Sequence, residues 1–113
     1  MINNKILTTV LGTEVRDFKQ LDNYVYYNKT TWVNADYPTA LGDFEGRVNT
    51  DTLVRLCKEW LLSQGFVINV QMSDDITLVY IGAIDKDIQG KTEADAVFKA
   101  VNYIIEYKLK EEE

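Results

Sequence analysis

Histidine is absent from this 113-residue chain, and its absence removes several kinds of chemistry at once. Without histidine there is no Ser-His or Cys-His nucleophilic pair, and no side chain whose ordinary pKa lies near neutral pH. The single cysteine, Cys57, cannot close an intramolecular disulfide, and a structural zinc site needs several Cys and His ligands. These absences exclude a catalytic histidine, a zinc centre and a disulfide-dependent fold, and the lone cysteine favours a reducing cytoplasm.

Long apolar runs are absent as well. The stretch Ile6–Leu11 is interrupted by Thr8 and Thr9, so it is too short for the apolar core of a secretory signal. No run approaches the roughly 20 apolar residues of a membrane span. We therefore expect a cytoplasmic protein without a membrane partner.

The composition that remains is that of one globular domain covering residues 1–113, with a frayed acidic tail from about residue 110. The formal charge is −6. Because an acidic domain repels the phosphate backbone, direct nucleic-acid binding is disfavoured. A protein partner with a basic surface is the natural alternative, beside the simpler explanation that the charge confers solubility.

Three segments carry helical signals. Asparagines at positions 3 and 4 can cap a short helix over Lys5–Leu11, and a glycine follows it. Apolar residues at three- and four-residue spacings predict a second helix over Asp51–Gln64, with Trp60 on its buried face. The capping-box pattern Thr92–Asp95 predicts the start of a third helix, and Phe98 lies on the apolar face of that helix. We expect Trp60 and Phe98 to anchor the core.

Strand signals lie between these helices. Tyr24–Tyr27 and Thr30–Val33 flank the turn residues Asn28 and Lys29 and predict a hairpin. Phe66–Met72 alternates in polarity, and Ile76–Ile84 is apolar on both faces, as in a central strand. The expected order is α-β-β-α-β-β-α, an α+β fold with an antiparallel sheet of about four strands and helices packed on it.

Aromatic residues crowd the hairpin and the long irregular stretch of residues 34–48 that follows it. Long loops and exposed aromatic side chains are both frequent in protein interfaces. Tyr24 and Tyr26 share one face of their strand, which we expect to be core. The interface candidates among the aromatic residues are Tyr27, Tyr37 and Phe44.

Carboxylates are expected to gather at one end of the molecule. If the second helix packs antiparallel to the strand after it, its acidic start lies near the turn at Asp74 and Asp75. If the last helix runs back toward that turn, its acidic end lies there as well. The expected acidic pole comprises Asp36, Asp43, Glu45, Asp51, Asp74, Asp75 and Glu111–Glu113. The predicted partner-binding residues are Tyr37, Asp43, Phe44, Glu45, Asp74 and Asp75.

One segment, Asp85–Gly90, has the alternating oxygen ligands and the glycine of a calcium loop. The twelfth position of such a loop would be Ala96, where a bidentate glutamate belongs. The segment is better explained as a solvated turn before a capped helix, and we expect neither a metal nor a cofactor.

Several motifs together resemble the phage ABA sandwich domain family. They run from Tyr37-Pro38 through Trp60, and include Gly65-Phe66 and the Ala-rich segment Glu93–Val101. Those proteins come from phages and prophages. The resemblance implies a layered α/β/α fold without a defined activity, and it assigns no catalytic residues.

These observations favour a phage accessory protein that acts by binding rather than catalysis. The leading hypothesis is an acidic inhibitor of a host defence complex such as CRISPR-Cas, in which the acidic surface imitates nucleic acid toward a basic groove. The alternative is a protein that sequesters a small nucleotide-like signal, for which Arg47 beside Tyr37 would contact the ligand. An enzyme that uses carboxylates alone is the third class. The sequence leaves monomer and homodimer as alternatives.

Overall fold

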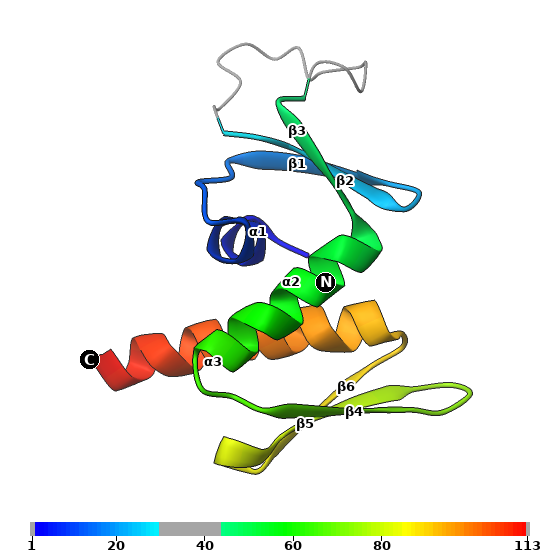
Figure 1. Ribbon diagram of the computed structural model, residues 1–113, viewed down its shortest axis with the longest axis vertical. Coiled ribbons are helices and arrows are strands. Elements are labelled where there is room, and N and C mark those ends of the chain that lie inside the picture. Colours follow the sequence, from blue (N-terminus) through cyan, green and yellow to red (C-terminus); the bar gives the residue numbers. More distant parts are fainter. Residues whose placement is uncertain (1, 30–43, 113) are drawn as a thin grey trace.

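The structure, a computed structural model, describes residues 2–29 and 44–112. Its elements follow the chain in a helix, strands, helix, strands, helix order (Figure 1). They are α1 (Asn4–Leu11), β1 (Asp17–Leu21), β2 (Tyr24–Asn28), β3 (Gly46–Asn49), α2 (Thr50–Ser63), β4 (Ile68–Met72), β5 (Thr77–Ile81), the short 3-10 helix η2 (Gly82–Ile84), β6 (Lys86–Gly90) and α3 (Glu93–Glu112).

The strands form two antiparallel sheets, which confirms the predicted α+β class. Sheet A has the order β1-β2-β3 and sheet B the order β4-β5-β6, where the sequence predicted about four strands in one sheet. The strands that the sequence did not predict, β1, β3 and β6, are short edge strands. Each buries so few residues that its alternation is hard to see in the sequence.

The helices lie between the two sheets. In Figure 1, α1 and the start of α2 face sheet A, while α3 lies across sheet B. Buried apolar residues from both sheets and all three helices form one cluster at this centre. The layer order is therefore sheet, helices, sheet, which differs from the α/β/α order that the family resemblance implies. Membership of that family stays a prediction.

The predicted first helix is confirmed, with its caps. The side chain of Asn3 accepts a hydrogen bond from the Ile6 N–H at 2.8 Å, and Gly12 ends the helix with a left-handed φ of 71°. Thr8, a poor helix former, has a different role. Its hydroxyl accepts a hydrogen bond from the N–H of Val15 at 2.9 Å and so holds the connection to β1.

The hairpin of sheet A lies one strand earlier than predicted. Its turn is Asp22-Asn23, where Asp22 adopts a positive φ of 54° that Asp tolerates better than most residues. Asn28, predicted to be a turn residue, instead ends β2 with a fully buried side chain. The predicted second strand, Thr30–Val33, lies outside the described residues.

The last helix runs in the opposite direction to the one predicted. Gly90, at the end of β6, pairs with Thr77 beside the β4–β5 turn, so α3 starts near that turn. It then returns along β6, where Lys86 lies over the Tyr103 ring at 5.3 Å from its centroid. The end of α3 therefore lies toward Asp85. The extra strand β6 reverses the chain once more than the sequence predicted.

The two predicted core anchors differ in burial. Phe98 on α3 is 4% exposed, whereas Trp60 on α2 is only partly buried against the core. The chain from residue 110, expected to fray, continues α3 as far as Glu112. Within the described residues, no helix is both long and apolar enough to cross a membrane.

Candidate functional site

The two faces of β2 have different roles, and they are the reverse of those predicted. Val25 is fully buried and Tyr27 packs against the core. Because side chains alternate along a strand, Tyr24 and Tyr26 lie on the opposite, outer face of sheet A, where both are half-buried. The expectation that Tyr24 and Tyr26 belong to the core and Tyr27 to an interface is therefore wrong.

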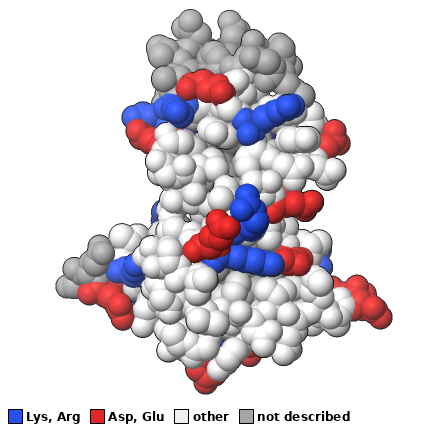
Figure 2. Space-filling view, in the orientation of Figure 1, with Lys and Arg blue, Asp and Glu red and all other residues white. Residues whose placement is uncertain are grey.

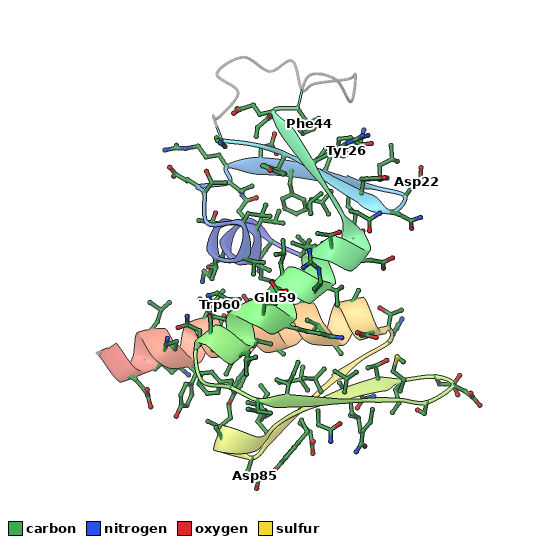
Figure 3. The ribbon with its side chains drawn as sticks, viewed as in Figure 1. Asp22, Tyr26, Phe44, Glu59, Trp60 and Asp85 are labelled. Atoms are coloured by element: carbon green, nitrogen blue, oxygen red, sulfur yellow. The ribbon has the colours of Figure 1, made fainter. Side chains whose placement is uncertain are left out.

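A row of three aromatic rings lies on this outer face. The ring centroids of Tyr24 and Tyr26 are 6.3 Å apart, and those of Tyr26 and Phe44 are 6.0 Å apart. The interplanar angles of 43° and 50° are those of tilted contacts. Such distances are typical of favourable aromatic pairs. Figure 3 shows Tyr26 and Phe44 together at the sheet A end of the molecule.

Two cationic residues flank the row. The register places Lys19 of β1 and Arg47 of β3 on either side of Tyr26, and both are exposed. The guanidinium carbon of Arg47 lies 5.2 Å from the centroid of the Tyr24 ring, a cation–π contact. We call the set Lys19, Tyr24, Tyr26, Phe44 and Arg47 the aromatic face.

Phe44 is held in the row by the residues beside it. The Glu45 N–H donates to the buried Asn28 side-chain oxygen at 2.8 Å, and the Glu45 carboxylate accepts from the Lys29 N–H at 3.1 Å. These two hydrogen bonds attach the segment before β3 to the end of β2. The predicted contact residue Glu45 therefore has a structural role in positioning Phe44.

Glycine at position 46 makes room for the inner face of the same strands. Gly46 pairs with Tyr27, whose ring covers it, and a Cβ atom there would lie 2.5 Å from the ring carbon Cζ. The Tyr27 ring thus packs over the glycine backbone and toward the core. This packing explains why Tyr27 is unavailable to a partner.

The predicted acidic pole is not assembled. Asp74 and Asp75 lie in the β4–β5 turn of sheet B, whereas Glu45 precedes β3 in sheet A. Asp51 follows β3, near the Asp22-Asn23 turn, because the neighbouring Thr50 N–H donates to the Asn23 carbonyl. The reversed α3 carries Glu111 away from the β4–β5 turn. Figure 2 shows acidic side chains spread from sheet A to sheet B on the visible face.

Some predicted residues cannot be compared with the structure. Tyr37 and Asp43, together with Asp36 of the expected pole, lie outside the described residues. Arg47, predicted to contact an anion beside Tyr37, is placed beside Tyr24 instead. The structure therefore brings together Phe44 and Arg47 from the predicted set and adds Lys19, Tyr24 and Tyr26 to them.

The remaining chemical candidates are structural. Cys57 is fully buried in α2, and this burial raises the pKa of its thiol to about 12, so the thiol is protonated at neutral pH. The segment Asp85–Gly90, compared above with a calcium loop and expected to be a solvated turn, is mostly strand β6. Within residues 2–29 and 44–112, no three His, Cys, Asp or Glu side chains are grouped to hold a metal ion.

Of three shallow hollows lined by described residues, the smallest, of about 70 Å³, lies along α3 and the other two lie between elements. One, of about 290 Å³, lies between α2 and the start of α3, where Lys58 and Glu93 form an ion pair. The other, of about 380 Å³, lies between β6 and α3, where Lys86, Lys99 and Glu106 put both signs of charge on its walls. The second hollow also contains a cation beside a ring, Lys86 over Tyr103, but the aromatic face has a row of three rings in mutual contact.

Comparison with known proteins gave no match. The chain matches no protein-family model, no curated protein and no solved structure.

Proposed function

We propose that this chain is a non-catalytic binding protein of phage origin that contacts a host protein through the aromatic face. In the bacterial cytoplasm, the contact blocks a defence complex such as CRISPR-Cas. The observation that carries the proposal is the row Tyr24-Tyr26-Phe44 with Arg47 beside it, on the outer face of sheet A.

Composition and rigidity both support this surface. Tyrosine and arginine are enriched among the residues that dominate protein-binding energies. Tyr24 and Tyr26 come from the central strand of sheet A, which is hydrogen-bonded on both sides. Because the strand already orders their backbone, binding costs less conformational entropy than it would for a mobile loop.

The distribution of carboxylates favours this face over the acidic pole of the original hypothesis. A pole that imitates nucleic acid needs its charges together, and here Glu45, Asp51 and Asp74 lie on different parts of the fold. The net charge of −6 still favours solubility and long-range attraction to basic proteins. It does not define the contact surface.

The proposal is tested by phage infection of bacteria that carry an active CRISPR-Cas system. Cells that express this protein should allow more plaques than cells that do not. The double variant Tyr24→Ala/Tyr26→Ala should lose that effect while its urea unfolding curve stays cooperative. The matched control is Tyr80→Ala, which removes a 38% exposed tyrosine from sheet B.

Two results would contradict the proposal. Unchanged plaque numbers with the unaltered protein would remove the inhibitor function for that defence system. Equal inhibition by the double variant and the unaltered protein would show that the aromatic face is not the contact surface.

Binding of a nucleotide-like signal is the second candidate, and one observation favours it. Arg47 lies over the Tyr24 ring, so its free N–H groups can pair with a phosphate beside a stacked base. Calorimetric titration with AMP, GMP and cyclic di-AMP tests this function. Binding that Arg47→Ala removes and Arg55→Ala retains would support it, whereas an absence of heat with all three ligands would contradict it.

A further inference from the structure

We infer that the partner segment that docks on the aromatic face is acidic, with carboxylates on either side of an apolar side chain. This inference rests on the proposed protein-binding function and adds the chemistry of the partner. Its starting point is the pair of exposed cations, Lys19 and Arg47, that flank Tyr26 on a protein whose net charge is −6.

Some cations of the fold form ion pairs. Elsewhere, Arg55 pairs with Glu59, Lys58 with Glu93 and Lys99 with Asp95. Lys19 and Arg47 form no ion pair in the part of the chain that the structure describes. Among the described residues, two exposed cations beside the aromatic row are therefore left without an ion pair.

The position of these cations defines the partner geometry. Lys19 and Arg47 lie on the two strands that flank β2, in one row with Tyr26. Two strand spacings separate their backbones by about 10 Å. In an extended partner segment, residues two positions apart point to the same face, so two carboxylates can flank an apolar side chain that covers Tyr26. The planar guanidinium group of Arg47 can donate two parallel hydrogen bonds to a carboxylate.

Carboxylates at one end limit the site to the other side. Exposed Glu45, two residues before Arg47, lies beside Asn28, to whose side-chain oxygen its N–H donates. By alternation Asp17 shares the face of Lys19, but it lies at the far end of β1, opposite Asn28. Its charge repels an anion that extends toward that end. The acidic partner segment is therefore expected over Lys19, Tyr26 and Arg47, extending toward Tyr24.

A polynucleotide fits this surface less well than an acidic peptide. Affinity for nucleic acid grows with the number of phosphates that cations neutralise. The face supplies two cations, and the surrounding carboxylates repel a chain of phosphates that extends beyond them. Two carboxylates on a short segment match the available charge.

The test uses a synthetic peptide of sequence Glu-Ser-Leu-Ser-Glu and the intact protein, followed by amide NMR shifts. The peptide should shift the signals of β1, β2 and β3, while Gln-Ser-Leu-Ser-Gln should shift them far less. Lys19→Glu and Arg47→Glu should each weaken binding on the order of tenfold. Lys5→Glu, an exposed substitution on α1 with the same change in net charge, should leave binding unchanged.

Three outcomes would overturn the inference. They are equal shifts with the Gln peptide, shifts confined to sheet B, and tighter binding of a short oligothymidylate than of the acidic peptide. This test can fail independently of the proposed function. The phage assay tests the contribution of the aromatic rings, whereas the peptide titration tests the contribution of the two cations. Loss of inhibition in Tyr24→Ala/Tyr26→Ala together with full inhibition by Lys19→Glu and Arg47→Glu would reject only the acidic partner.

Discussion

Gly90 of β6 lies directly against the backbone of Ala96 on α3. A Cβ atom added at Gly90 would lie 2.8 Å from the Cα and 3.0 Å from the Cβ of Ala96, and it would also contact the Ala96 nitrogen. Both residues are buried. The glycine therefore sets how closely the last helix approaches the edge of sheet B.

Replacing this glycine should destabilise the protein. Because the obstructing atoms belong mainly to the backbone of α3, Gly90→Ala has to push the helix from the sheet, at a cost of about 1–3 kcal/mol in unfolding free energy. Gly82→Ala is the control, since its nearest neighbour would be a Tyr80 ring carbon at 3.8 Å. Urea unfolding measures both, and equal midpoints for the two variants would show that β6 and α3 are less closely packed.

The two predicted core anchors, Trp60 of α2 and Phe98 of α3, should differ in their contributions to stability. Phe98→Ala removes a ring that is 4% exposed and should cost about 3–5 kcal/mol. Trp60→Ala should cost less, because Trp60 is only partly buried. A larger loss for Trp60→Ala, measured by urea unfolding, would contradict this order.

The buried thiol should make stability depend on alkaline pH. Burial raises the pKa of Cys57 from its usual 9.0 to about 12. Above pH 9, the unfolded chain loses the thiol proton while the folded chain keeps it, so stability falls as pH rises from 9 toward 12. The stability advantage over Cys57→Ala, measured by urea unfolding, should therefore shrink between about pH 7 and about pH 10. A constant difference would mean that the thiol ionises equally in both states.

The Asn28 side chain should matter for both stability and the position of Phe44. Asn28→Ala leaves the Glu45 N–H without its acceptor and should cost about 1–3 kcal/mol. The amide signals of Phe44 and Tyr26 should shift in the same variant. Asn69→Ala, at an exposed position of β4, is the matched control. Unchanged signals of Phe44 would show that another contact holds the ring.

Removal of metal ions should leave the melting temperature unchanged. Asp85 has a left-handed φ of 48° and residues 86–90 form β6, so the segment that resembles a calcium loop is part of a sheet. Thermal unfolding with and without EDTA makes the comparison. A lower melting temperature with EDTA would indicate a bound cation.

Most local elements of the fold can be predicted from short stretches of sequence. Asn3 and Gly12 mark the ends of α1, Asn49 caps α2, and the hydroxyl of Thr92 accepts from the Asp95 N–H at the start of α3. These signals are readable because a cap or an apolar stripe depends on residues within about four positions of each other. The strands β4 and β5 were predicted for the same reason.

Only the tertiary structure decided which strands pair and which side of β2 faces the core. Strands β1, β3 and β6 are held by hydrogen bonds to neighbours in the sheet, and little in their own residues marks them. Because β6 was missing from the predicted order, α3 was expected to run in the opposite direction. Its acidic end was therefore placed wrongly at the β4–β5 turn. The prediction assigned the two faces of β2 the wrong way round. Alternation in the sequence shows that Tyr24 and Tyr26 share a side, but it does not show which side the helices cover. Both decisions depend on contacts between residues far apart in the chain, and the aromatic face exists only because those contacts bring β1, β2 and β3 together.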